Sequence, residues 1–208
     1  MIETVRNAWK IPDLRKKLLF VLFAIVVFRF GHAIYVPFVD TAALAAAFSA
    51  QNSSNLLGYF NVLSGGGLAT ASIFALSIYP YINSSIIVQL LQVAIPALER
   101  MAKDEGEEGK KKLQRITRYG TLVLAILMAT GYYIMIRSMG VLTRSDVWAA
   151  IVIITTFVAG AMFVVWLGDQ ITEKGIGNGI SVILLAGIVS QGYGALMKVI
   201  SMPWWAAI

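Results

Sequence analysis

The sequence contains no cysteine and a single histidine, His32, among its 208 residues. The lack of cysteine excludes disulfide frameworks and cysteine-ligated zinc or iron–sulfur sites, and one histidine excludes a histidine-only metal centre. Charge is scarce as well, since only 13% of residues are Asp, Glu, Lys or Arg, about half of the roughly 25% of a soluble domain. These absences remove most classes of enzyme, and we predict no catalytic residue, no cofactor and no metal site.

Apolar residues are abundant: they make up 58% of the chain, and the mean hydropathy is +0.76. Long apolar stretches, each near or above the roughly 20 residues that cross a bilayer as a helix, cover residues 18–38, 73–98, 119–139, 147–168 and 178–197. They cannot all be buried in one small soluble core, because too little polar surface would remain. We therefore predict an all-α, polytopic membrane protein of five transmembrane helices.

The distribution of basic residues predicts the orientation of these spans. Lys and Arg outnumber Asp and Glu by 17 to 11, and most of them lie in residues 1–17 and 99–118, with Lys174 on the same side. Because cytoplasmic loops retain Lys and Arg, residues 1–17 are expected to be a cytoplasmic segment and the chain to end outside. No basic patch is interleaved with aromatic residues, so direct binding of nucleic acid is not favoured.

The outer segment between the first two spans contains a short apolar piece, residues 56–63, followed by Ser64 and three glycines. Eight helical residues cover about 12 Å, too little to cross a bilayer. A re-entrant helix enclosed by protein is one interpretation. An amphipathic helix that lies on the outer membrane surface is the other, and the residues alone do not separate the two.

Two local features have both a structural and a functional interpretation. Pro80 lies in the first third of the second span, with Ser84 and Ser85 one turn later, so it predicts a kink that is either inert or part of a helix lining a cavity. The run Gly-Ile-Gly-Asn-Gly at residues 175–179 resembles a phosphate-binding loop. Because no strand precedes it, a tight cytoplasmic turn is the favoured interpretation.

Charged residues are the remaining candidates for function. Arg29 falls about halfway through the first span, with His32 three residues later; we expect Arg29 to be a buried charge that faces the protein interior, with either a structural or a functional role. No Asp or Glu lies inside a predicted span, which disfavours an ion-coupled carrier. The mixed charges of residues 99–118 favour a solvated hairpin over a docking site for a partner.

Four strings in this sequence carry a family resemblance. They are SIFALSIYPYINSSIIVQLL at residues 72–91, WLGDQITEKGIGNGIS at residues 166–181, QRITRYG at residues 114–120 and RFG at residues 29–31. In this order and spacing, the sequence resembles the N-terminal half of the SecY protein-translocation channel over nearly its whole length. Residues 18–208 would then be the N-terminal five-helix half of a ten-helix channel with pseudo-two-fold symmetry.

The resemblance also implies roles for particular residues. A pore ring of apolar side chains would include Ile78, Ile82, Ile180 and Leu184, and each of these two i, i+4 pairs shares one helix face. The second and third spans would form one side of a lateral gate. A short plug helix, re-entrant from outside, would close the channel with residues Leu56, Leu57, Tyr59, Phe60, Val62, Leu63, Gly65, Gly66 and Gly67.

The implied function is the central pore of the Sec translocase in the cell membrane, which conducts secretory polypeptides and releases membrane segments into lipid. The implied partners are the C-terminal half of the same channel, SecE-like and SecG-like subunits, a SecA motor or ribosome, signal sequences with their unfolded polypeptides, and membrane lipid. We expect the chain to be a fragment or to work beside a second chain. The alternatives are a small-solute transporter or ion channel of five spans, and a membrane scaffold.

Overall fold

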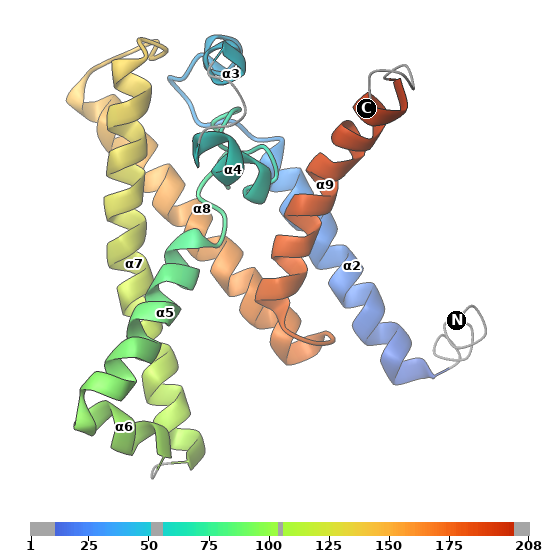
Figure 1. Cartoon of the computed structure of the whole chain (residues 1–208), viewed down its shortest axis with the longest axis vertical. Coiled ribbons are helices and arrows are strands. Elements are labelled where there is room, and N and C mark those ends of the chain that lie inside the picture. Colours follow the sequence, from blue (N-terminus) through green and yellow to red (C-terminus); the bar gives the residue numbers. More distant parts are fainter. Residues whose placement is uncertain (1–10, 51–55, 104–105, 202–208) are drawn as a thin grey trace.

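The computed structural model describes residues 11–50, 56–103 and 106–201, with side chains for residues 11–49, 58–103 and 106–192. The described part is helical and contains no named strand (Figure 1). Its helices are α2 (Pro12–His32), α3 (Thr41–Ala50), α4 (Leu56–Leu63), α5 (Tyr79–Ala94), α6 (Pro96–Lys103), α7 (Gly106–Ser138), α8 (Val147–Lys174) and α9 (Gly179–Ser201).

The all-α prediction is confirmed, and the predicted spans overlap mainly α2, α5, α7, α8 and α9, in chain order. The count of five crossings is not confirmed. In the described residues, α7 and α8 are long and apolar enough to cross a membrane, and α5 with α6 would be a third span if this pair, bent by 103°, is taken as one. Helices α2 and α9 are not among these candidate spans, because α2 contains several basic residues and the described apolar part of α9 is short.

Helix α8 lies in the middle of the arrangement. It contacts α7 on one side and α2 and α9 on the other, while α5 packs against α7. Helices α3 and α4 lie at one end of the molecule and α6 lies at the opposite end (Figure 1). Two isolated backbone bridges, Tyr35 with Ser72 and Val39 with Leu142, join the connecting segments.

Two apolar clusters form the core on either side of α8. In the first, Phe157 of α8 packs with residues of α7 that include Ile136 and Tyr132; in the second, Val164 of α8 packs with Phe28 of α2 and Ile183 of α9. One helix therefore joins both clusters.

The second span begins later than predicted, and the predicted kink at Pro80 is wrong. Residues 64–78 form turns, and α5 begins at Tyr79, so Pro80 lies in its first turn. A proline there interrupts no helical hydrogen bond, because the first amides of a helix have no partner within it. Ser84, one turn later, donates instead to the carbonyl of Thr117 in α7 at 2.8 Å.

The charged residues 99–118, predicted to form a solvated hairpin, belong to two consecutive helices that pack against each other, and most of their described side chains are exposed. Helix α6 occupies Pro96–Lys103, and α7 begins at Gly106, well before the apolar stretch that starts at residue 119. Ion pairs one turn apart, Glu99 with Lys103 and Glu107 with Lys110, stabilise these helices modestly. At the N-terminus, α2 likewise begins at Pro12, within the segment predicted to precede the first span.

Candidate functional site

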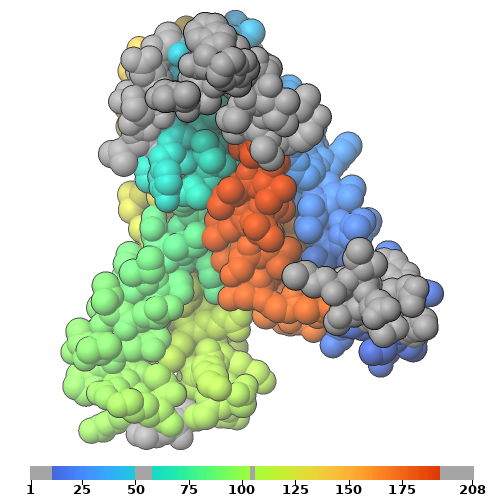
Figure 2. All heavy atoms as spheres, turned by 45° about the vertical axis from the view of Figure 1, so that its right-hand side comes forward, coloured from blue at the N-terminus to red at the C-terminus, as the bar shows by residue number. Residues whose placement is uncertain are grey.

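A cavity of about 370 Å³ opens between α5 on one side and α8 with α9 on the other. Figure 2 shows the molecule divided on this side between the green region of α5 to α7 and the orange region of α8 and α9. The wall of the cavity includes four apolar or aromatic side chains, Tyr81, Ile82, Ile86 and Ile180. Six polar side chains complete the wall: Ser85, Gln89, Gln114, Asp169, Thr172 and Asn178. The cavity therefore joins an apolar wall to a polar one.

The predicted ring residues occupy two different environments. Ile82 and Ile180 line the cavity, and Leu184 is partly buried against the same apolar cluster. Ile78 instead lies fully buried, at 0% exposure, within this half of the predicted channel. The structure thus brings Ile82 and Ile180 to one open surface, whereas a place for Ile78 on that surface stays a prediction.

The glycine-rich run at residues 175–179 is a tight turn between α8 and α9. Gly177 has φ +76°, in the left-handed region that favours glycine. The amide of Gly179 donates to Thr172 Oγ1 at 2.9 Å, and the amide of Ile180 donates to Asn178 Oδ1 at 3.0 Å. Because Thr172 of α8 and Asn178 of the turn already accept from these amides, the structure supports the turn interpretation over a phosphate-binding loop.

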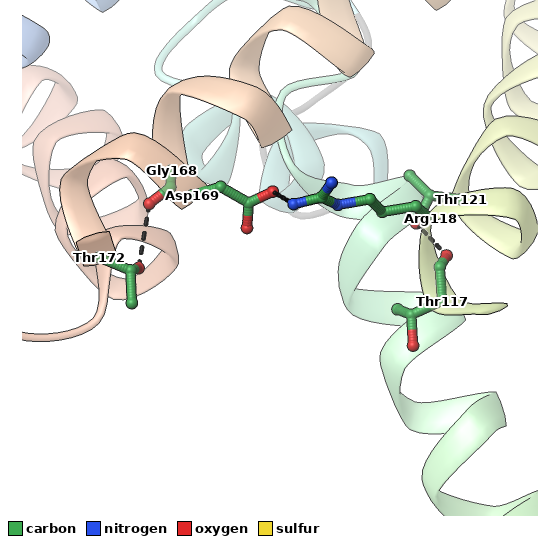
Figure 3. A network of polar contacts seen from close by, with 6 residues as sticks. All are labelled: Thr117, Arg118, Thr121, Gly168, Asp169 and Thr172. Carbon is green, nitrogen blue, oxygen red and sulfur yellow. Dashed lines mark hydrogen bonds and ion pairs between the residues drawn. The ribbon is translucent and has the colours of Figure 1, made fainter. Parts of the chain in front are cut away.

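An ion pair joins α7 to α8 beside the cavity. Arg118 Nη2 lies 2.7 Å from Asp169 Oδ2, and the Asp169 side chain is only 12% exposed against 48% for Arg118. Figure 3 shows the guanidinium extending from α7 toward the carboxylate on α8. The quoted strings contain both residues, but their separation of 51 positions gave no signal that they meet.

Helix α4 matches the predicted short piece at both ends and closes with a glycine turn. The amide of Gly66 donates to Asn61 O at 2.8 Å and that of Gly65 to Val62 O at 3.0 Å, which together form a Schellman motif. Both glycines have positive φ, +68° and +87°, as this motif requires at its first glycine. The side chains of Tyr59, Phe60 and Val62 are exposed, whereas those of Leu56 and Leu57 lie outside the described residues.

The end of α4 and the residues that follow it contact α5, α7 and α9. A Cβ atom added at Gly187 of α9 would lie 3.1 Å from Leu63 O and 3.6 Å from the amide nitrogen of Gly65. From α5, the Tyr79 hydroxyl donates to Phe60 O at 3.4 Å, and from α7 the Tyr132 hydroxyl donates to Leu68 O. These contacts support an enclosed position, but whether α4 is re-entrant stays a prediction, because the structure contains no membrane.

Arg29 is exposed in this chain, and its burial within a whole channel stays a prediction. Helix α2 turns Ala24, Phe28 and Gly31 toward its neighbours, and Arg29, one position after Phe28 and so about 100° around the helix, is exposed. His32, to which the sequence assigned no role, instead contacts the end of α4. Among the described residues, no group of three or more His, Asp or Glu side chains could hold a metal ion.

Comparison with known sequences identifies relatives that match most of this chain. A family model described as SecY matches residues 72–207. The protein translocase subunit SecY of Pseudomonas aeruginosa is 49% identical over 180 residues, covering 86% of this chain and 40% of the relative. The subunit of the same name from Escherichia coli K12 is 47% identical over 182 residues, covering 86% and 41%. The chain thus spans about two fifths of the length of these relatives.

Solved structures show the same fold. One, titled "The structure of a protein conducting channel", superposes with a TM-score of 0.58 at 18% identity, covering 88% of this chain and 40% of that one. A second, Sec61 in the canine ribosome–channel complex from the endoplasmic reticulum, gives the same TM-score, identity and coverage. At this identity the likeness speaks for the arrangement of the helices alone.

Proposed function

The chain belongs to the SecY family, and on that basis we propose that it forms the N-terminal half of the pore of a Sec protein translocase. The pore would conduct unfolded secretory polypeptides across the cell membrane and release membrane segments into lipid. The observation that carries this proposal is the cavity between α5, α8 and α9, with Ile82 and Ile180 in its wall and polar side chains beside them. Such a surface offers a polypeptide a passage without binding it tightly.

The apolar collar is the proposed barrier to ions. Ile82, Ile180 and Leu184, with Ile78 behind them, would meet equivalent side chains of the second half. A narrow apolar constriction disfavours a continuous column of water and so blocks ions by dewetting. Branched aliphatic side chains can still separate around a passing polypeptide, and this requires no catalytic group.

The plug is the proposed second barrier. Residues 56–67 would fill the outer side of the pore at rest, a position supported by the packing of Leu63 and Gly65 against Gly187 of α9. The lateral gate is proposed at α5 and α7, where Ser84 of α5 hydrogen-bonds Thr117 of α7. The N-terminus is proposed to be cytoplasmic, since the basic residues favour that side.

The partners follow from the family and from what this half lacks. A second polypeptide or chain segment would supply the C-terminal half, because the chain covers 40% of its Pseudomonas relative. We further propose SecE-like and SecG-like subunits, and a SecA motor or ribosome as the source of energy. The solved Sec61 structure was itself determined in a ribosome–channel complex.

Substitution of a collar residue tests the proposal. In the assembled channel, reconstituted in lipid vesicles, Ile82→Asn is expected to raise resting ion leak about tenfold, because a polar side chain permits wetting of the constriction. The same variant should export substrates with defective signal sequences more readily. Ile87→Asn is the matched control, since Ile87 is exposed on α5 but does not line the cavity. Equal leak in the two variants and the unsubstituted channel would contradict the proposed collar.

A further inference from the structure

His32 lies at the junction of α2 with the plug segment, residues 56–67. It is the last residue of α2, and its ring is positioned by aromatic neighbours on two sides. The ring centroid lies 4.5 Å from that of Phe28 and 5.8 Å from that of Phe74, with interplanar angles of 66° and 71°. Edge-on contacts of this kind restrict the orientation of the imidazole.

Both ring nitrogens face backbone carbonyl oxygens. Nδ1 lies 3.0 Å from Phe28 O, one turn earlier in α2, and Nε2 lies 2.7 Å from Ser64 O. A carbonyl oxygen only accepts, so the shorter contact requires a hydrogen on Nε2 that is donated to Ser64. The hydrogen bond therefore crosses from α2 to a residue 32 positions further along the chain.

The carbonyl of Ser64 belongs to the end of the plug helix. Ser64 follows α4 directly, and its own amide donates to Phe60 O at 2.9 Å, so it is the C-cap residue. The last carbonyls of a helix have no partner within the helix. The Schellman turn satisfies those of Asn61 and Val62, and the carbonyl of Ser64 receives a long contact from the amide of Gly67 at 3.4 Å and the much shorter one from His32 at 2.7 Å.

Other contacts to the same segment are weaker as restraints. Helix α9 approaches through the small residue Gly187, with Ser190 Oγ and Gln191 Nε2 beside Gly65 and Gly66; the Ser190 hydroxyl donates within α9, to Gly187 O at 2.6 Å. The hydroxyl of Tyr79 reaches Phe60 O at 3.4 Å, at an exposed position. The bond from His32 is shorter, is partly buried and ends at the point where the helix turns.

We propose that His32 is a positioning residue that holds the plug in its closed place by donating from Nε2 to the carbonyl of Ser64. This inference rests on the proposed function, because it concerns the plug of that channel. Loss of the bond would favour displacement of α4 from α9 without affecting the apolar collar. His32 would thereby set how readily the resting channel opens.

Asparagine and glutamine at position 32 provide a matched test. The Gln amide nitrogen takes nearly the place of Nε2, whereas the Asn amide nitrogen takes nearly the place of Nδ1, so only Gln keeps a donor toward Ser64. In assembled channels in vesicles, His32→Asn is expected to raise resting ion leak about two- to tenfold, the effect of one hydrogen bond on a two-state equilibrium. His32→Gln should stay within about twofold of the unsubstituted channel.

The plug itself can be followed with a thiol probe. The chain has no cysteine, so Val62→Cys, at an exposed position of α4, introduces its single thiol. An impermeant maleimide added from outside should label it about two- to tenfold faster with His32→Asn than with His32→Gln. His32→Phe, which keeps the ring packing but has no donor, should behave like the Asn variant.

The outcomes separate this inference from the proposed function. If Ile82→Asn raises the leak but the Asn and Gln variants at position 32 label and leak equally, the role of His32 is wrong and the channel stands. Equal effects of Asn and Gln would also reveal a general loss of packing. If Ile82→Asn leaves the leak unchanged, the proposed collar is contradicted, whatever the variants at position 32 do.

Discussion

Gly160 of α8 lies against the backbone of the segment that precedes α5. A Cβ atom at this position would collide with the carbonyl of Ile73, and that backbone is itself fixed, because the amide of Ile73 donates to Ile34 O at 3.0 Å. A single absent methyl group thus allows α8 to approach the start of the second span.

Gly160→Ala is therefore expected to destabilise the protein by about 1–3 kcal/mol, the cost of overpacking a core that cannot relax. Thermal unfolding of the purified channel in detergent measures this as a lower Tm. Gly131→Ala in α7 is the control, since a Cβ there meets nothing within 4 Å, and alanine should leave the Tm equal or slightly higher. A Tm for Gly160→Ala equal to that of the control would show that the segment can move aside.

At the scale of residues, the sequence identified candidate side chains better than it identified the groups that these side chains contact. Ile82 and Ile180 were predicted together and do share a cavity. The partner of His32 is a backbone carbonyl, and since every residue has one, no sequence pattern reveals which is used. The exposure of Arg29 in this chain was not evident from the sequence, because an apolar helix gives little indication of which of its faces is covered by neighbours.

At the scale of helices, the contact between α5 and α7 depends on one hydroxyl and one glycine. Ser84 is buried and donates to Thr117 O at 2.8 Å. Gly120, one turn beyond Thr117, leaves room for the same hydroxyl, with which a Cβ atom would collide. A polar contact between closely approaching helices is typical of membrane proteins.

Ser84→Ala is expected to lower the stability of the channel by about 1 kcal/mol, because the carbonyl of Thr117 loses a buried donor. Denaturation in a mixed detergent series measures the difference. Ser85→Ala is the neighbouring control, since the Ser85 hydroxyl accepts from Gln89 at an exposed position and its loss should cost less. A larger effect at Ser85 than at Ser84 would contradict the importance of this contact.

The ends of the helices were harder to predict than their existence. Hydropathy reports which residues suit a bilayer, whereas a helix ends where its backbone hydrogen bonds end. Helix α7 therefore continues through charged residues to Gly106, beyond the apolar stretch. The second span begins at Tyr79, because the preceding residues form turns, including Ser77 with φ +47°.

At the scale of the whole molecule, the chain exposes large apolar surfaces on several helices. Phe23 and Phe30 of α2, Leu90 and Val93 of α5 and Leu127 of α7 are more than half exposed. Lipid and partner subunits are the expected covers of such surfaces in a membrane protein. The open cavity between α5, α8 and α9 would form one side of the proposed pore, and a second half would form the other.

Expression of the chain alone is therefore expected to give membrane insertion but no export of a reporter with a signal sequence. Co-expression with the remaining C-terminal part of a SecY-family protein should restore export and allow the two parts to be purified together. A chain with the Gly160→Ala substitution should associate less. Export by the chain without any second half would contradict the proposed division of the pore.

Helix α7 is also long enough that a small tilt at one end would displace its other end by several ångströms. Its 33 residues form one uninterrupted rod, attached near the cavity by Arg118 to Asp169 and near the plug by Tyr132 to Leu68. Those two attachment points lie about 21 Å apart along the axis, so a tilt of about 10° around the first would displace the second by about 4 Å. That displacement exceeds the reach of a hydrogen bond. A tilt of that size would therefore separate Tyr132 from the segment that follows residues 56–67, if the packing of α7 against α5 and α8 moved with it.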